Sequence, residues 1–168
     1  MKLTKQPNLS SCGPTAIVNT LKLLGKHQTR KDIYKLQKEC KTSRTHGTSE
    51  KNVKKALDNR GFKTRYIEGP TMSEILNHLN NNGKIILGYD YICDDGTFEG
   101  HYIVINSYKG RNLQVVNHIS LEKIKRLTKV SEFKTIDSIS RIELREYLKT
   151  KYFEGIAYHS VAILVYPS

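Results

Sequence analysis

The chain has no long apolar run and only three cysteines. Its 168 residues contain no stretch near the roughly 18 uninterrupted apolar residues that a membrane-spanning helix needs, and no apolar segment follows the basic start as it does in a signal peptide. Cys12, Cys40 and Cys93 are far apart and form no CxxC pair, which argues against a disulfide framework and a zinc site. We therefore expect a soluble protein in the reducing cytoplasm, with no membrane span.

Internal repeats, low-complexity tracts and Pro- or Ser-rich linkers are also missing. A chain of this length fits one domain and buries roughly 70% of the surface that its unfolded form exposes. Because no boundary is visible, we predict a single domain over residues 1–168; the sequence leaves the oligomeric state open.

Acidic residues are few, and the charges are segregated. The chain has 28 Lys and Arg against 16 Asp and Glu, a formal net charge of +12. Fourteen of the basic residues lie within residues 22–65, whereas residues 85–108 contain no Lys or Arg. A basic face can meet nucleic acid or an acidic partner. Since the chain has no nucleic-acid-binding motif, a solvated helical surface is the favoured interpretation.

The apolar pattern predicts helices in the first third of the chain. Ser10 or Ser11 can cap a helix that has Pro14 in its first turn and stops at Gly25. This places Cys12 at or just before a helix N-terminus. Two more helices are expected over residues 31–39 and 49–59, the second entered through the loop Gly47-Thr48-Ser49.

Strand signals dominate the remainder. The predicted elements are, in chain order, a strand over residues 62–67, a helix over 73–79, an apolar strand over 84–92, a hairpin of 100–108 with 113–117, a mostly helical stretch over 120–150 and a strand over 157–166. The hairpin would bring His101 and Asn117 to the same end of its strands. The predicted class is α+β, with N-terminal helices packed on an antiparallel sheet and a helical insertion or extension at about 119–150.

Four residues have the chemical types that thiol catalysis needs. Cys12 is the candidate nucleophile, because a helix N-terminus and an imidazolium both stabilise a thiolate. His101 would act as the base and then as the acid toward the leaving amine, and Asn117 would orient its ring. The Gln6 side chain and the Cys12 backbone N–H would form the oxyanion hole. Gly100, just before the histidine, leaves backbone space for a substrate.

Other interpretations of these residues stay open. A cysteine at a helix start can be a small buried hydrophobe, and His118 or Asp90 could replace Asn117. A metal site built from His101, His118 and His159 is disfavoured, because no Cys or carboxylate lies at ligand spacing. No cofactor is implied.

At these positions the chain resembles the papain-like cysteine peptidases, and most closely their double-glycine branch, which trims leader peptides from bacteriocins and related peptides. The resemblance covers residues 1–118 and rests on Gln6, Cys12-Gly13-Pro14, Gly47-Thr48, Gly100-His101-Tyr102 and Asn117. The branch usually has Asp-Pro where this chain has Asn117-His118, but papain itself uses Asn. The resemblance implies a papain-like fold and a thiol peptidase that acts on peptide or isopeptide bonds, with a cleft suited to small residues.

Two other functions use the same residues. An acyl-enzyme can be resolved by an amine instead of water, which would make the protein an amide transferase or deamidase. A catalytically degenerate domain would instead bind a peptide or an acidic partner without turnover. For the enzyme, Asp94, Asp95 and Gly100 are candidate substrate-binding residues. The acidic run before His101 is favoured as an ordinary hydrophilic loop; the alternative hypothesis is a subsite wall that selects Lys or Arg near the cleaved bond.

Overall fold

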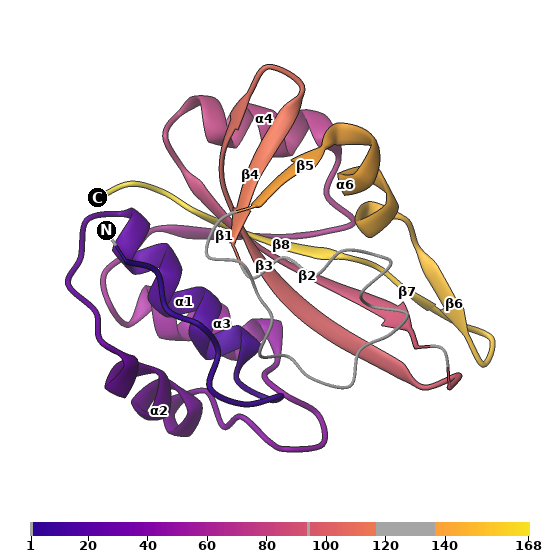
Figure 1. Ribbon diagram of the computed structural model, residues 1–168, viewed down its shortest axis with the longest axis horizontal. Coiled ribbons are helices and arrows are strands. Elements are labelled where there is room, and N and C mark those ends of the chain that lie inside the picture. Colours follow the sequence, from indigo (N-terminus) through magenta and orange to yellow (C-terminus); the bar gives the residue numbers. More distant parts are fainter. Residues whose placement is uncertain (1, 94, 117–136) are drawn as a thin grey trace.

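A six-stranded antiparallel sheet forms the centre of the computed structural model (Figure 1). The structure describes residues 2–93, 95–116 and 137–168. The strand order is β1-β8-β2-β3-β4-β5, and β6 and β7 form a separate two-stranded hairpin. The elements are, in chain order, α1 (Cys12–Leu23), α2 (Arg30–Glu39), α3 (Glu50–Asp58), β1 (Thr64–Glu68), α4 (Met72–Asn80), β2 (Lys84–Ile92), β3 (Phe98–Lys109), β4 (Asn112–Val116), β5 (Asp137–Ser140), α6 (Arg141–Leu148), β6 (Lys151–Phe153), β7 (Ile156–Tyr158) and β8 (Val161–Val165).

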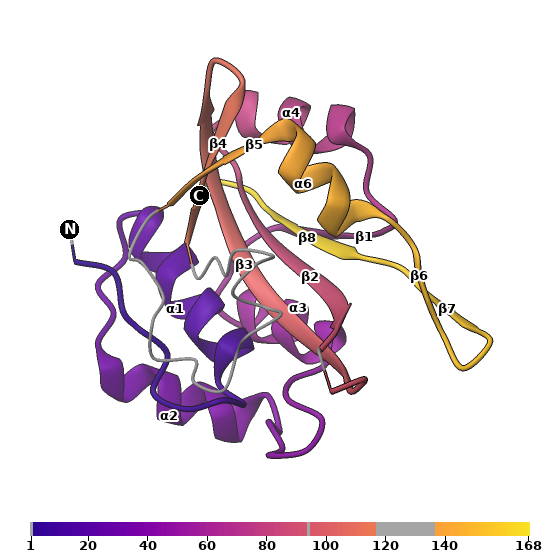
Figure 2. The same cartoon turned by 45° about the vertical axis from the view of Figure 1, so that its right-hand side comes forward.

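Helices cover both faces of this sheet. Successive side chains of a strand point to opposite faces, so β2 and β3 contribute to two hydrophobic clusters. Ile86 and Val104 pack with residues of α1, α2 and α3, while Ile85 and Ile103 pack with residues of α4 and α6. Figures 1 and 2 show α1–α3 gathered on one side of the sheet and α4 and α6 on the other. The class is therefore α+β, as predicted, with a second helical layer that the sequence interpretation did not include.

Local signals set the helix boundaries. Thr29 and Asp32 form a capping box at the start of α2, and the Ser49 side chain accepts a hydrogen bond from the Asn52 N–H at the start of α3. These caps satisfy backbone donors that a first helical turn leaves unpaired. α2 and α3 begin within one residue of their predicted starts, and α1 begins at Cys12, at the predicted helix N-terminus.

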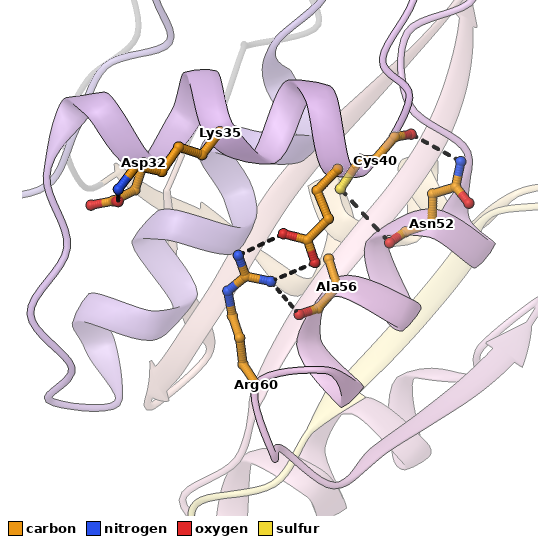
Figure 3. Close-up of polar contacts among 7 residues, drawn as sticks. Asp32, Lys35, Cys40, Asn52, Ala56 and Arg60 are labelled. Carbon is orange, nitrogen blue, oxygen red and sulfur yellow. Dashed lines mark hydrogen bonds and ion pairs between the residues drawn. The ribbon is translucent and has the colours of Figure 1, made fainter.

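Polar contacts join α2 to α3 (Figure 3). Arg60 donates to both carboxylate oxygens of Glu39, at 2.8 and 2.7 Å, and to the Ala56 carbonyl at 2.7 Å. The Asn52 amide donates to the Cys40 carbonyl at 2.9 Å. The hydrogen bonds from Arg60 lower the pKa of Glu39. These contacts hold α2 and α3 together beside α1.

Two sequence predictions about the C-terminal third are wrong in part. Residues 137–140 form the strand β5 and not a helix, because Ile139 pairs with Leu113 of β4 and is buried in the core. The predicted strand over 157–166 is two elements: β8 lies in the main sheet, whereas β7 turns out to pair with β6. Residues 141–148 of the predicted helical stretch form α6, as expected, whereas residues 120–136 and Asn117 lie outside the described residues.

The β6–β7 hairpin projects from the body of the sheet (Figures 1 and 2). Phe98, at the start of β3, stacks on Phe153 with ring centroids 4.9 Å apart and contacts Tyr158 at 4.4 Å. This aromatic contact joins the hairpin to the β2–β3 end that precedes His101. No helix within the described ranges has the length and apolar character to cross a membrane.

Candidate active site

Cys12 is the first residue of α1, directly after the N-cap Ser11. Its side chain is 6% exposed, and every residue of α1 from Cys12 to Leu21 is buried. The unpaired N–H groups at a helix N-terminus carry partial positive charge that favours an anion. The fold therefore gives this thiol one of the two features that stabilise a thiolate.

Gly13 allows a loop to approach the helix start closely. A Cβ at this position would lie 2.9 Å from the Cβ of Thr48, a distance that real side chains do not adopt. Thr48 is fixed in turn, because its carbonyl accepts a 2.6 Å hydrogen bond from the Tyr102 hydroxyl and its hydroxyl is 2.6 Å from that of Thr42. The Gly13–Thr48 approach and the Tyr102–Thr48 hydrogen bond thus bring Cys12-Gly13, Gly47-Thr48 and Tyr102 together in the fold.

His101 lies on β3 and is 5% exposed. The backbone of Tyr102, the next residue, hydrogen-bonds to the Cys12 thiol. On the neighbouring strand β2, Tyr89 is the cross-strand partner of His101. The fold thus brings the predicted nucleophile against the strand segment that carries the predicted base.

Burial controls the ionisation of Cys12. It raises the pKa of the thiol to about 11, although hydrogen bonds from the backbone of Tyr102, Gly13 and Cys12 itself lower it in part. The sequence interpretation expects a depressed thiol pKa in an active enzyme. Backbone donors alone therefore do not give a thiolate at neutral pH, and a positive charge on an adjacent imidazole would be needed to lower the pKa further.

Gln6 is buried and bonded within its own loop. Its side-chain amide donates to the carbonyls of Asn8 and Leu9, at 2.7 and 3.2 Å. Its Oε1 atom is buried and has no hydrogen-bond partner among the described residues. In this arrangement the predicted oxyanion donor stabilises the loop that precedes α1.

A carboxylate lies against Gly100. The Asp90 Oδ1 atom would be 3.0 Å from a Cβ on Gly100, its cross-strand partner. Burial and the neighbouring carboxylate of Glu50 raise the pKa of Asp90 to about 6. The space that the glycine leaves therefore borders an acidic side chain, and no pattern in the sequence linked Glu50 to this place.

The other predicted site residues are less closely connected to Cys12. Asp95 is exposed, and its Oδ1 accepts hydrogen bonds from the Thr97 N–H at 2.9 Å and the Thr97 hydroxyl at 2.6 Å, which lower its pKa. Asp94, Asn117 and His118 lie outside the described residues. Within the part of the chain that the structure covers, no group of three or more His, Cys, Asp or Glu side chains could hold a metal ion.

Comparison with known proteins shows similarity to peptidases in sequence and in fold. The sequence model of the peptidase C39 family matches residues 1–138. The peptidase domain of Streptococcus ComA, a bi-functional ABC transporter of a quorum-sensing pathway, has a similar fold, with a TM-score of 0.60, 17% identity and 98% coverage of both chains.

Two further solved structures share the fold. A double-glycine-motif protease from an AMS/PCAT transporter, solved with its leader peptide, has a TM-score of 0.58 and 15% identity, with 99% of this chain and 91% of that chain covered. A C39-like peptidase from Bacillus anthracis has a TM-score of 0.56 and 9% identity, with 95% and 92% covered. No curated protein matches the chain by sequence. These likenesses establish the papain-like α+β fold that the sequence predicted.

Proposed function

The chain belongs to the peptidase C39 family, and from this premise we propose that it is a cysteine peptidase that cleaves peptide or isopeptide bonds through Cys12, His101 and Asn117. One observation carries the proposal: the Cys12 thiol is buried at the N-terminus of α1 and hydrogen-bonded to the strand backbone next to His101. A nucleophile and a base on neighbouring elements are the minimum that thiol catalysis requires.

Cleavage would proceed through an acyl-enzyme. His101 takes the thiol proton as Cys12 Sγ attacks the carbonyl carbon. The resulting oxyanion accepts a hydrogen bond from the Cys12 backbone N–H. His101 then returns the proton to the leaving amine, which leaves a thioester on Cys12. Water attacks the thioester, His101 accepts a proton from that water and gives it to the departing sulfur, and the acid product leaves. Asn117 would orient the imidazole throughout.

The high pKa of Cys12 bears on the first step. A thiol with a pKa of about 11 holds its proton at neutral pH, so His101 has to accept that proton either before the substrate binds or during the attack. In both cases His101 is required for reactivity at neutral pH. Replacing His101 with alanine would therefore leave a thiol that reacts only under strongly alkaline conditions.

A direct test is capture of the thioester. The parent protein is incubated with a pool of synthetic peptides that contain small residues at their cleavage sites, and intact protein mass is followed with and without hydroxylamine, which cleaves thioesters. The proposal expects a hydroxylamine-sensitive adduct on Cys12 and two peptide fragments, neither formed by Cys12→Ala. If Cys12→Ala releases the same fragments, the activity does not belong to this thiol.

For the substrate we propose a peptide with Lys or Arg near the cleaved bond. The acidic stretch before His101 supports this preference, since Asp95 is exposed with a lowered pKa and Glu99 is exposed too. Asp94 belongs to the same stretch. The AMS/PCAT protease was solved in complex with the leader peptide, which also supports a peptide as the substrate.

The matched variants for this preference are Asp95→Asn and Asp95→Ala. Asparagine keeps the side-chain acceptor that bonds the Thr97 N–H but removes the charge, whereas alanine removes both. If charge selects the substrate, both variants lower kcat/KM for Lys- and Arg-containing peptides by roughly two- to five-fold, as expected for one exposed ion pair, and leave neutral peptides unchanged. An effect confined to Asp95→Ala would assign the residue to the turn alone.

A binding module is the second candidate, and two observations favour it. The Gln6 amide is engaged with backbone carbonyls, and burial holds the pKa of Cys12 high, so two parts of the catalytic arrangement are not preset for turnover. A binding module would retain peptide affinity in Cys12→Ala and show no adduct in the parent. Isothermal titration of the same peptides separates the two functions.

A further inference from the structure

We propose that Tyr89 and Tyr147 hold the His101 imidazole in its working orientation, and that α6 thereby acts on catalysis from the face of the sheet opposite to α1. The two tyrosines are positioning residues that act through the histidine. This inference rests on the proposed function, in which His101 is the base for Cys12.

The first contact of this arrangement crosses two central strands. Tyr89 on β2 and His101 on β3 are cross-strand partners, with ring centroids 5.9 Å apart and planes at 83°. This edge-to-face geometry is a favourable arrangement for two aromatic rings. Both side chains are buried, at 3% and 5% exposed. The imidazole therefore has an aromatic wall on its β2 side.

The second contact fixes that wall. The Tyr147 ring of α6 lies 4.6 Å from the Tyr89 ring, centroid to centroid, at 35°. Tyr147 is 2% exposed, and its hydroxyl donates to Glu143 one turn earlier in the same helix, at 3.4 Å. Three rings thus run from α6 through β2 to β3. Because interiors are close-packed, a tyrosine held on one side by Tyr147 cannot move away from His101 without opening a void.

The element that supplies Tyr147 lies beyond the family match. The matched residues end at 138, and α6 begins at Arg141, capped by the Ser140 hydroxyl, which accepts a 3.0 Å hydrogen bond from the Glu143 N–H. Figure 2 shows α6 standing over the sheet on the side away from α1. The C-terminal part of the chain therefore reaches the candidate site through packing.

Removing the Tyr89 hydroxyl distinguishes the role of the ring from that of the polar group. This hydroxyl is buried and has no hydrogen-bond partner among the described residues, and burial raises its pKa well above the ordinary value, so it stays protonated. A phenylalanine would keep the ring and remove a buried hydroxyl that lacks compensation. The proposal therefore expects Tyr89→Phe to behave like the parent at His101.

The orientation of the base controls the rate, because small displacements of a catalytic group cost large factors in reactivity. Tyr89→Leu and Tyr147→Leu remove the rings but retain apolar volume. For each we expect the His101-dependent rate of Cys12 alkylation by iodoacetamide at pH 7 to fall by about ten- to a hundred-fold. Tyr89→Phe should remain within about two-fold of the parent, because it keeps the ring contact.

Loss of core packing could also lower reactivity, so the experiment includes a second readout and a matched control. Ring ¹⁵N chemical shifts from NMR report the tautomer and pKa of each imidazole, and His101→Gln identifies the His101 signal among the six histidines. Leu113→Ala is the control: Leu113 is fully buried in the same hydrophobic cluster and pairs with Tyr108 and Ile139, far along the sheet from His101. If Tyr89→Leu does not fold, Tyr89→Met provides another ring-free side chain of adaptable shape.

The proposal is supported if the ring-free variants shift the His101 ¹⁵N signals and slow alkylation while Tyr89→Phe and Leu113→Ala do neither. It is overturned if the ring-free variants keep the parental His101 signals, or if Leu113→Ala shifts them equally. The proposed function fails separately, when His101→Ala labels as fast as the parent at pH 7. In that event the NMR comparison still decides whether the two tyrosines orient the imidazole.

Discussion

Cys12 experiences opposing influences that the sequence reveals only in part. Its place at a helix start follows from local signals, Ser11 before it and Pro14 after it, and the structure confirms that place. The burial that raises its pKa to about 11 comes from packing of α1 against a distant strand. A pattern of residue types can therefore predict a nucleophile, whereas its resting protonation depends on the tertiary structure.

The close approach of Gly13 to Thr48 leaves no room for a larger residue at position 13. In Gly13→Ala the added Cβ would lie 2.9 Å from Thr48 Cβ, so the Thr48 loop must move. We expect a loss of about 1–3 kcal/mol in the free energy of unfolding, typical of overpacking, and slower alkylation of Cys12, measured by urea denaturation and mass spectrometry.

The matched variant is Gly13→Ala combined with Thr48→Gly, which removes the clashing atom and should recover part of the alkylation rate. Equal stability of Gly13→Ala and the parent would contradict the steric argument. A double variant no faster than Gly13→Ala would show that the Thr48 side chain does more than limit space.

At the scale of elements, the β6–β7 hairpin depends on one aromatic contact with the main sheet. Phe98 contacts both Phe153 and Tyr158, and an isolated two-stranded hairpin is only marginally stable in water. Phe98→Ala should therefore loosen the hairpin, raising amide hydrogen exchange over residues 151–158 by about ten-fold or more, because local opening then costs little.

Exchange in the core strand β8 should be much less affected by this change. Tyr66→Ala is a suitable control, since Tyr66 is an exposed aromatic on the edge strand β1 that pairs with Ile163 of β8 and not with the hairpin. Unchanged exchange over residues 151–158 in Phe98→Ala would mean that the hairpin is held by other contacts.

The sequence predicted an element correctly where the residues that determine it lie within or next to that element. The starts of α2 and α3 were predictable because capping residues within three positions fix them, and β2 was predicted with its observed bounds because it is a largely apolar segment. β5 was missed because Ile139 is its only apolar residue, and its pairing with β4 comes from distant sequence.

The candidate site shows the same difference between local and distant signals. Cys12, Gly100 and His101 were proposed from motifs, but the pairing of His101 with Tyr89 requires the strand register, and the contact of Tyr89 with Tyr147 requires α6 to fold back over the sheet. Spacing along the chain predicts neither of these contacts. Sequence reasoning therefore proposes residues for the candidate site, and the structure adds the residues that surround them.

For the whole molecule, His78 connects three parts of the core. Its Nε2 atom lies 3.2 Å from the Lys84 carbonyl of β2 and 3.1 Å from the Val165 carbonyl of β8, so this nitrogen carries the proton. Burial lowers the pKa of His78. The folded protein therefore favours the neutral form of the His78 ring.

This arrangement predicts an acid-sensitive stability. Because the folded pKa lies below the unfolded value of about 6.5, the unfolded chain binds an extra proton between the two values. The contribution of His78 is fully present above the unfolded pKa and is lost as pH falls through this interval. In His78→Gln, which keeps a side-chain donor, the free energy of unfolding from urea titrations should vary less with pH between 7 and 5. If the free energy of unfolding varies with pH in the same way in both proteins, His78 is not the source of the acid sensitivity.

The central claim, that His101 activates Cys12, is tested most directly by the pH dependence of iodoacetamide labelling at Cys12 in the parent and in His101→Ala, read by mass spectrometry with Cys40 and Cys93 alongside. Because His101 takes the proton from a thiol whose resting pKa is about 11, the parent should label at pH 7 much faster than His101→Ala. His101→Ala should label only as pH approaches the value of about 11 that burial sets, and Cys40, whose pKa is also about 11, should stay slow in both. Identical profiles for parent and variant would contradict the account and assign the domain to peptide binding without turnover.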